Sequence, residues 1–227
     1  MLYEEWVPPY EAILADFDYD RAGDERARDR LLELVAGSDP LTPDDVDLSG
    51  TVAVCGAAPT LGEELDTARR ADRVVAASNA ASVCLDAGIV VDCMVTDLDK
   101  TPETARMLSE RGVPVAVHAH GDNIETIERY VPMFDISSVL PTTQAAPVPP
   151  VVNLGGFTDG DRAAFLADHC GADRLVFPGW AFDDPTVSAE KAKKLRWAER
   201  LLRWLEDRRN ERFPVLDGRR EAIDRPW

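Results

Sequence analysis

Two aspartates, Asp97 and Asp99, stand where an apolar segment ends and a helix is expected to begin. The apolar run 89–95 is typical of a buried strand, and Thr-Pro-Glu at 101–103 is typical of a helix start, with the threonine as N-cap. Residues two apart in an extended segment share a face, so we expect both carboxylates to point the same way and Leu98 to turn back. Adjacent carboxylates repel unless a cation lies between them, and Mg²⁺ prefers such oxygens. The alternative is an ordinary loop of an acidic protein.

A loop of small residues, GAAPTL at 56–61, follows the apolar segment 51–55. Small residues let the backbone approach a phosphate, and the start of a following helix favours an anion. The loop has neither the GxGxxG pattern of a dinucleotide fold nor the GKS/T pattern of a P-loop. Its candidate binding residues are Gly56, Ala57, Pro59 and Thr60.

The segment HAHGDN at 118–123 follows another apolar strand. Two histidines two residues apart, His118 and His120, have a spacing that can bind a transition metal. No cysteine or glutamate nearby supports a zinc or iron site, so we favour hydrogen bonding by His120 near a polyphosphate. Asp122 is either a polar partner in the site or the N-cap of the next helix.

A third loop, NLGGFTDGDRA at 153–163, offers glycines, two carboxylates and an arginine at a helix start. Asp159 and Asp161 are candidate metal ligands, and helix capping is a strong competing role for both. The candidate binding residues of this loop are Asn153, Gly155, Thr158 and Arg162.

A long amphipathic helix is predicted from Ser188 onward. Residues 188–212 hold nine basic and five acidic side chains, in a chain that is otherwise strongly acidic. Lys191, Lys193 and Lys194 lie in its first turns, and Lys191 stands four residues before Leu195. Lys191 is therefore expected on the buried stripe of this helix, which is formed by Leu195, Ala198, Leu202 and Leu205.

These residue types favour phosphoryl-type transfer. Carboxylates would hold Mg²⁺, glycines would admit phosphates, and basic side chains would offset charge. Such reactions need positioning and charge neutralisation more than covalent help from the protein. No Ser-His-Asp or Cys-His arrangement supports hydrolysis of the triad type.

Strands and helices must alternate to bring these loops together. Apolar segments predict strands at 51–55, 73–78, 89–95, 113–120, 135–140, 150–156 and 173–179, and helices are predicted at 61–71, 79–88, 102–112, 122–131 and 161–171. This alternation predicts an α/β, Rossmann-like fold with a mostly parallel sheet and helices on both faces. The loops after the strands then meet at the carboxyl edge of the sheet, where ligands bind.

The chain is predicted to have three parts: an N-terminal helical extension at 1–49, an α/β catalytic core at 50–180, and a C-terminal helix and tail at 181–227 packed on the core. Residues 1–20 carry scattered aromatics and two prolines, so we expect them to drape over the core, whereas 24–37 has a helical pattern. The Pro-rich stretch 141–150 is interpreted as a surface connection rather than a lid.

The charge of the chain excludes several partners. With 42 acidic and 25 basic side chains, the formal net charge is −17, which argues against nucleic acid and anionic membranes. Only four bases are lysines, and a carboxylate-rich surface with few lysines is typical of the salt-rich cytoplasm of a halophilic archaeon. The alternative is an acidic protein from an ordinary cell. No apolar run is long enough to span a membrane and the N-terminus is unlike a signal peptide, so we expect a soluble, cytoplasmic protein.

The four cysteines form no CxxC and are interpreted as reduced packing residues.

Four motifs together carry a family resemblance. GAAPTL (56–61), VTDLDK (95–100), HAHGDN (118–123) and NLGGFTDGDRAA (153–164), followed by a lysine-rich helix, resemble the archaeal 6-hydroxymethyl-7,8-dihydropterin pyrophosphokinases. The motifs follow the same order over residues 50 to 205, and TDLD with FTDGDRA is the more specific part. That family is related in fold to thiamine pyrophosphokinases, which carry a similar Asp-x-Asp.

The resemblance implies an activity and a set of roles. A diphosphate would pass from ATP to the hydroxymethyl oxygen of the pterin with release of AMP, in a Mg²⁺-dependent step toward folate or methanopterin. Asp97 and Asp99 would hold the metal, with Asp122, Asp159 or Asp161 as further ligands or polar partners. Residues 56–61 would approach the phosphates, and Lys191 and Lys194 would neutralise charge near the β-phosphorus.

The pterin contacts and the oligomeric state are less defined by the resemblance. Asn79 and Asn153 are candidates for pairing with the amidine edge of the pterin ring. The last helix, near Trp204, is a candidate homo-oligomer interface. Two positions depart from the family pattern: Ala58 replaces a more usual glycine, which narrows backbone freedom, and Lys100 replaces a glycine after Asp-Leu-Asp, which places a cation beside the carboxylates. Both leave the details of phosphate binding open.

Two other classes of function stay open. One is an NAD(P)-dependent oxidoreductase of Rossmann type, which is weakened by the missing GxGxxG and by Ser78-Asn79 where an acidic residue would end the second strand. The other is a non-catalytic relative that binds a nucleotide or a partner. Paired carboxylates in two loops argue against it, because they would destabilise a site that holds no metal.

Overall fold

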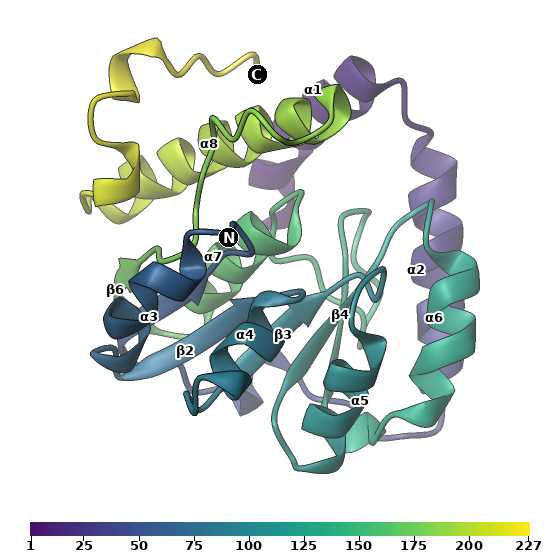
Figure 1. Ribbon diagram of the computed structural model, residues 1–227. Coiled ribbons are helices and arrows are strands. Elements are labelled where there is room, and N and C mark those ends of the chain that lie inside the picture. The colour runs from purple at the N-terminus through teal and green to yellow at the C-terminus, as the bar shows by residue number, and fades with distance from the viewer.

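A six-stranded parallel sheet in the order β5-β4-β3-β2-β1-β6 forms the centre of the computed structural model, which describes residues 1–227 (Figure 1). Every strand pair is parallel. The predicted α/β class is therefore confirmed. The strands are β1 (Gly50–Cys55), β2 (Arg73–Ala77), β3 (Cys93–Thr96), β4 (Val115–Ala119), β5 (Val139–Thr143) and β6 (Ala172–Val176).

The two faces of the sheet carry separate hydrophobic cores, because successive strand residues point to opposite sides. Val52 and Val54 of β1 belong to one core, together with α7 (Asp159–His169). Ala53 and Cys55 belong to the other. The helices of this second face are α3 (Leu61–Arg69), α4 (Ala80–Asp86), α5 (Pro102–Glu110) and α6 (Ile124–Tyr130), as Figure 1 shows.

The direction in which strands are added reverses at β1. Strands β2 to β5 lie on one side of β1, whereas β6, which follows α7, pairs with its other side. The loops after β1 and β6 therefore lead to opposite faces of the sheet. This is the kind of position at which open α/β sheets bind ligands.

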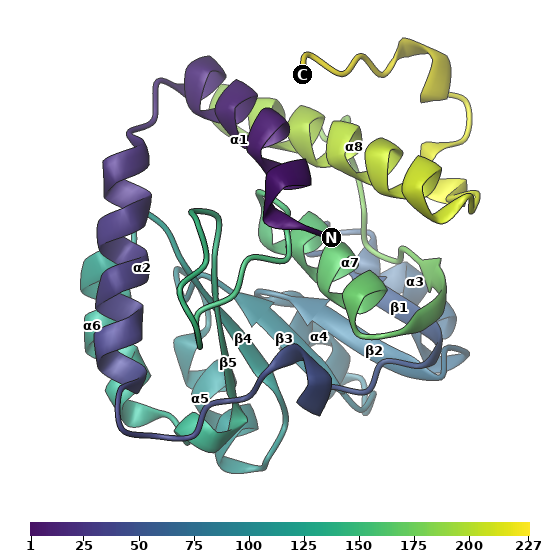
Figure 2. The ribbon, with the colours of Figure 1, turned by 180° about the vertical axis from the view of Figure 1, so that it is seen from behind.

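The N-terminal segment differs from its prediction. It forms a helix, α1 (Tyr3–Phe17), although Pro8 and Pro9 lie inside it. Trp6, Tyr10 and Ile13 are spaced for one helical face, and all three are buried against the core. Burial of this face outweighs the hydrogen bonds that the prolines remove. Helix α2 (Arg21–Val35) follows and packs against α6 and the β5 edge of the sheet (Figure 2).

Four further local predictions were wrong in their boundaries or detail. The strand expected at 89–95 is only Cys93–Thr96, and Val90 is exposed. Residues 136–138 form a short 3₁₀ helix before β5, and the strand expected at 150–156 is reduced to isolated bridges, one of them joining Val152 to Thr142. Thr101 precedes α5, but its side chain caps nothing because the residue is left-handed, with φ 48°.

Helix α8 (Ala189–Arg209) covers the α7 face beside α1 (Figure 2). Ser188 caps it by accepting a hydrogen bond from Lys191 N (3.1 Å). The tail beyond α8 folds back, and its Arg220 pairs with the buried Glu206 at 2.6 Å.

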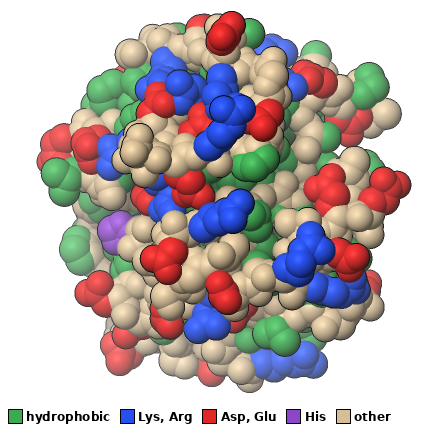
Figure 3. All heavy atoms as spheres, turned by 90° about the vertical axis from the view of Figure 1, so that its left-hand side faces the viewer, with side chains coloured by type: hydrophobic (Ala, Val, Ile, Leu, Met, Phe, Trp, Pro, Cys, Tyr) green, Lys and Arg blue, Asp and Glu red, His purple; other side chains and the backbone are tan.

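Figure 3 shows basic and acidic side chains interspersed over one face of the molecule. The other 3₁₀ helices are Pro43–Asp45, Val131–Met133, Pro214–Leu216 and Arg220–Ala222. None of the helices combines the length and the apolar character that crossing a membrane requires.

Candidate active site

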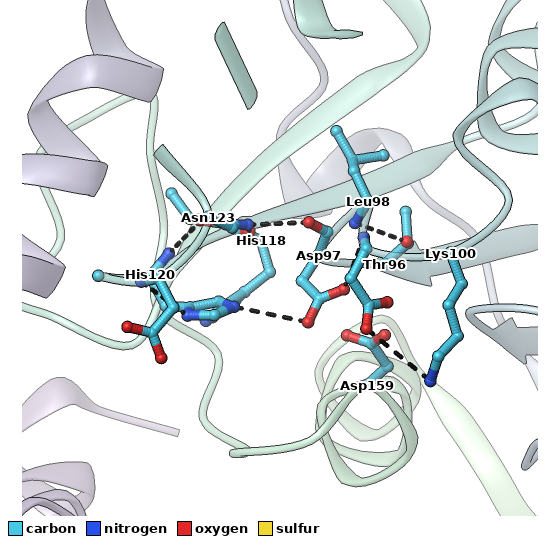
Figure 4. Close-up of polar contacts among 12 residues, drawn as sticks. Thr96, Asp97, Leu98, Lys100, His118, His120, Asn123 and Asp159 are labelled. Carbon is cyan, nitrogen blue, oxygen red and sulfur yellow. Dashed lines mark hydrogen bonds and ion pairs between the residues drawn. The ribbon is translucent and has the colours of Figure 1, made fainter. Parts of the chain in front are cut away.

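Three carboxylates meet at the carboxyl edge of the sheet. Each of Asp97, Asp99 and Asp159 places one carboxylate oxygen within 4.8 Å of those of the other two (Figure 4). Asp97 and Asp99 follow β3, and Asp159 is the first residue of α7. The cluster therefore joins the middle of the sheet to the helix on its opposite face.

The turn after β3 explains how two neighbouring aspartates reach one point. The segment is not extended, because Leu98 is left-handed (φ 66°). Its N–H donates to Thr96 Oγ1 (2.9 Å), and Asp99 N–H donates to Asp97 Oδ1 (3.1 Å). The Leu98 side chain is buried in the core below. The predicted side-by-side arrangement is present, but a tight turn rather than a strand produces it.

The electrostatics of the cluster require a compensating charge. Burial and, after it, the charge of Asp97 raise the pKa of Asp159 to about 7. Burial and hydrogen bonding to Asp97 likewise raise the pKa of Asp99. Burial also works against Asp97, but His120 and Asp99 hold its pKa well below the usual range through hydrogen bonds. Three ionised carboxylates this close repel one another, and a donor set made only of carboxylate oxygens fits a hard cation such as Mg²⁺.

The loop after β4 supports Asp97. His120 Nε2 lies 3.5 Å from Asp97 Oδ2, and Asn123 Nδ2 donates to the carbonyl oxygens of Asp97 (2.9 Å) and His118 (2.7 Å) (Figure 4). Asn123, rather than Asp122, stands at the N-cap of α6. His118 is buried beside Thr142, with its Nδ1 3.0 Å from Thr142 Oγ1, and burial lowers its pKa well below the usual value. His118 is therefore a buried residue of the protein interior, whereas the side chain of His120 faces the carboxylates.

A cavity of about 630 Å³ opens above the cluster. Most of the predicted site residues line it. They are Gly56, Ala57, Pro59, Asn79, Asp97, Asp99, His120, Asp122, Thr158, Asp159, Arg162, Lys191 and Lys194.

Four predicted residues lie outside this cavity. Asp161 is buried and closes the start of α7, where its carboxylate accepts hydrogen bonds from Phe157 N (2.8 Å) and Thr158 N (2.7 Å). The competing capping role therefore applies to Asp161 and occupies its oxygens. Asn153 donates to backbone carbonyls of residues 144 and 145, and Gly155 N–H donates to Asn153 Oδ1 (2.9 Å), so both support the loop from behind. Thr60 lies just before α3.

The glycine loop after β1 contacts the end of β6. Gly56 N–H donates to Pro178 O (2.9 Å) and Ala58 N–H to Gly179 O (3.0 Å). A Cβ at Gly56 would collide with the Gly179 carbonyl and lie 2.9 Å from the Trp180 ring. Only glycine fits at Gly56, and the close packing fixes the wall of the cavity at the point where the strand order reverses.

Lysines approach the cluster from above. Lys191 of α8 lines the cavity, but it is exposed there rather than buried on the apolar stripe, where it was predicted. Partial loss of hydration lowers its pKa, and the charge of Lys100 acts in the same direction. Lys100 Nζ itself lies 3.8 Å from Asp99 Oδ2 (Figure 4). Lys194 pairs with Glu190 at 3.1 Å, and although burial opposes its charge, this hydrogen bond raises its pKa.

Several cavity residues were missed by the sequence analysis. Tyr19 lies between α1 and α2, Asp24 lies in α2, Gln144 directly follows β5, and Trp180 lies in the loop after β6. Gln144 lay inside a stretch interpreted as a plain connection. The strand was expected to end at residue 140, whereas β5 ends at Thr143, so nothing in the local sequence placed Gln144 at a strand end, and nothing marks Asp24.

The fold and the site define a class: an α/β protein with carboxylates for a divalent cation, small-residue loops and lysines around one cavity, as metal-assisted phosphoryl-type transfer requires. A family model described as "6-hydroxymethylpterin diphosphokinase MptE-like" matches residues 38–186. The chain belongs to this family.

Curated relatives are similar over almost the whole chain. A 6-hydroxymethyl-7,8-dihydropterin pyrophosphokinase of Methanothermobacter thermautotrophicus is 36% identical, covering 91% of this chain and 96% of the relative. Proteins of the same name from Pyrococcus furiosus and Methanocaldococcus jannaschii are 37% and 30% identical, covering 96% and 90% of this chain and 99% and 96% of the relatives. The match extends beyond residues 38–186 into the terminal helices.

Proposed function

We propose that this protein is a 6-hydroxymethyl-7,8-dihydropterin diphosphokinase. It transfers the diphosphate of ATP to the hydroxymethyl group of the pterin and releases AMP, with Mg²⁺ as its metal. The names of three relatives and the family match support a pterin substrate and the pyrophosphokinase class. The observation that carries the proposal is the Asp97, Asp99 and Asp159 cluster at the floor of a substrate-sized cavity.

The reaction forms a bond between the hydroxymethyl oxygen and the β-phosphorus and breaks the bond from the β-phosphorus to the oxygen bridging to the α-phosphorus. The hydroxyl proton is released to water, and AMP leaves with the bridging oxygen. Mg²⁺, when bound, neutralises phosphate charge and aligns the reacting oxygens. Asp97, Asp99 and Asp159 hold it in this proposal. Lys191, above the cluster, offsets the negative charge that shifts onto the leaving AMP, and Lys100 is placed to contact a phosphate beside Asp99.

The cavity has two chemically different ends, which suggests how two substrates share it. At the β1 and β6 end, the wall is made of small residues, including Gly56, Ala57 and Gly179. At the α2 and β4 end, the carboxylates of Asp20 and Asp122 line it, and Arg26 lies 3.8 Å from Asp20. A triphosphate is repelled by carboxylates that share no metal with it, whereas the 2-amino and N3–H groups of a pterin are donors. The nucleotide therefore occupies the first end and the pterin ring the second.

The cellular setting follows from the reaction. A cytoplasmic enzyme has access to ATP, and its product is a precursor of folate or of methanopterin. The charge of −17 fits a salt-rich cytoplasm such as that of a halophilic archaeon.

The test is a product assay in high salt with Mg²⁺, ATP and 6-hydroxymethyl-7,8-dihydropterin, analysed by chromatography. We expect AMP and pterin diphosphate from the wild type, no product from Asp97→Ala, and unchanged product from Asp66→Ala, a matched change on the exposed surface of α3. ADP in place of AMP would contradict diphosphate transfer. A folded protein that yields no nucleotide product would reject the proposal, and thermal protection by NAD would favour an oxidoreductase.

A further inference from the structure

A chain of hydrogen bonds connects the two N-terminal helices to Asp159. Arg162 Nη1 lies 3.2 Å from Asp159 Oδ1, and Arg162 Nη2 donates to Gln144 Oε1 (3.1 Å). Gln144 Nε2 donates to Asp24 Oδ2 (2.8 Å). Tyr10 of α1 donates to the same Asp24 oxygen (2.7 Å). The four side chains beyond Asp159 are all buried, and Asp24 forms no ion pair.

The chemistry of these groups fixes the direction of every bond. The oxygens of Asp24 accept from Tyr10 and from Gly121 N, so the amide nitrogen of Gln144, which donates, must face this carboxylate. The guanidinium of Arg162 only donates, so the amide oxygen of Gln144 must face Arg162. Asp24 is itself held at its second oxygen, because Oδ1 accepts from Gly121 N (2.8 Å). Gln144 therefore has a single orientation that satisfies both neighbours.

The backbone of Gln144 is held by the same part of the molecule. Trp6 Nε1 of α1 donates to the Gln144 carbonyl (3.0 Å), and Asn153 Nδ2 donates to it as well (2.9 Å). Asp24 also holds Gly121, whose close packing on Gly23 leaves a Cβ at Gly121 only 3.3 Å from the backbone of α2. Helices α1 and α2 thus fix two loops at the edge of the cavity, although both helices lie outside residues 38–186.

We propose that Gln144, oriented by Asp24, is a positioning residue that limits Arg162 to one hydrogen bond with Asp159. A guanidinium free of other partners pairs with a carboxylate through two parallel bonds. Nη2 is turned to Gln144 and Nη1 alone bonds Asp159, through Oδ1, so Oδ2 stays free of Arg162 and open to a divalent cation shared with Asp97 and Asp99. This inference rests on the metal site of the proposed function and adds the N-terminal helices to it.

The experiment measures Mn²⁺ alone, without nucleotide or pterin, by electron paramagnetic resonance of free Mn²⁺ in high salt. In Gln144→Leu and in Asp24→Asn, Arg162 can close on both oxygens of Asp159, and we expect the Kd for Mn²⁺ to rise about 10-fold, as for other residues that hold metal ligands. Glu206→Gln is the matched control, since Glu206 is an equally buried carboxylate in a hydrogen-bonded network of α8, remote from the cavity. It should lower Tm and leave the Kd unchanged.

A double-mutant cycle separates positioning from general damage. If Gln144 acts through Arg162, Gln144→Leu has no further effect on the Kd when Arg162→Leu is already present. An equal Kd in the wild type, Gln144→Leu and Asp24→Asn overturns the inference while leaving the pterin reaction untouched, since that is judged by its product. A Gln144→Leu effect that persists without Arg162 also overturns it. Failure of the wild type to bind Mn²⁺ at all rejects both the inference and the metal site on which it rests.

Discussion

Asp159, at the first position of α7, presents its carboxylate to Asp97 at the end of β3, so one pair of side chains joins the sheet to the helix on its far side (Figure 4). Asp161, only two residues further along α7, points into the turn and caps it. Neighbouring carboxylates in one motif therefore have separable tasks.

Replacing these two aspartates should separate metal binding from stability. Asp159→Asn removes a buried repulsive charge, so we expect no loss of stability without metal, but loss of the Tm increase that Mg²⁺ gives. Asp161→Ala removes a capping side chain and should cost about 1–2 kcal/mol of unfolding free energy while the Mg²⁺ effect persists. Denaturant unfolding with and without Mg²⁺ measures both. The reverse pattern would assign the metal to Asp161.

The raised pKa of Asp159 predicts a pH dependence. In the folded protein without metal its pKa is about 7, above the ordinary value of 3.8, so the folded state binds the extra proton between these two values. The free energy of unfolding should therefore fall as pH rises from about 4 to 7, and Asp159→Asn should remove this component. Mg²⁺ requires the ionised form, so its affinity should rise over the same interval. Urea titrations at a series of pH values compare wild type and variant, and parallel curves would contradict the assignment.

Two lysines on one turn of α8 provide a matched pair. Lys191 lines the cavity, whereas Lys193 pairs with Asp16 of α1 at 3.0 Å and lies over the Phe17 ring. We expect Lys191→Met to lower kcat about 100-fold, in the range found when one charge-stabilising donor is removed, with little change in Tm. Lys193→Met should lower Tm and spare kcat. Equal kcat values in both variants would show that Lys191 does not stabilise charge in the reaction.

The carboxylate end of the cavity is tested through Asp122. Its side chain is exposed to the cavity and accepts no hydrogen bond from the protein, so Asp122→Asn leaves the fold unaltered. If the pterin N–H groups bind there, the pterin Kd should rise about 10-fold, the effect of losing one charge-assisted hydrogen bond. Binding of an ATP analogue should not change. Pterin fluorescence measures the Kd for the pterin, and calorimetry measures the Kd for the ATP analogue. If Asp122→Asn weakened only nucleotide binding, the nucleotide would have to be assigned to the carboxylate end and the pterin to the other.

Local sequence patterns predicted the parts of the site that are local. Asp97, Asp99 and the start of α7 are each set by a strand or helix end next to the residue itself. The positive φ of Leu98 was not predicted, because it depends on burial of that side chain and on the Thr96 hydrogen bond. Two prolines concealed α1, whose formation depends on the core that receives Trp6 and Tyr10.

Contacts between distant parts of the chain were beyond the same reasoning. Gln144 forms a hydrogen bond with Asp24, although the two residues are 120 positions apart in the sequence. No local sequence pattern relates an aspartate in an N-terminal helix to a glutamine after the fifth strand. The family was predicted from motif order and is confirmed by the matches. The three-part division of the chain and the roles of the individual site residues stay predictions.

The acidic surface predicts how stability responds to salt. With a net charge of −17, the folded chain repels itself, and raising KCl from about 0.1 M to about 1 M shortens the screening length from about 10 Å to about 3 Å. Surface salt bridges such as Arg200–Asp224 are weakened by the same screening, but each exposed salt bridge contributes little to the free energy of unfolding. Relief of the overall repulsion should therefore dominate, and Tm should rise with KCl more than with an uncharged osmolyte at equal osmolality. Calorimetry measures Tm in the KCl series and in the osmolyte series. A Tm that falls with KCl would show that the lost stabilisation by ion pairs exceeds the relief of repulsion among the surplus acidic charges.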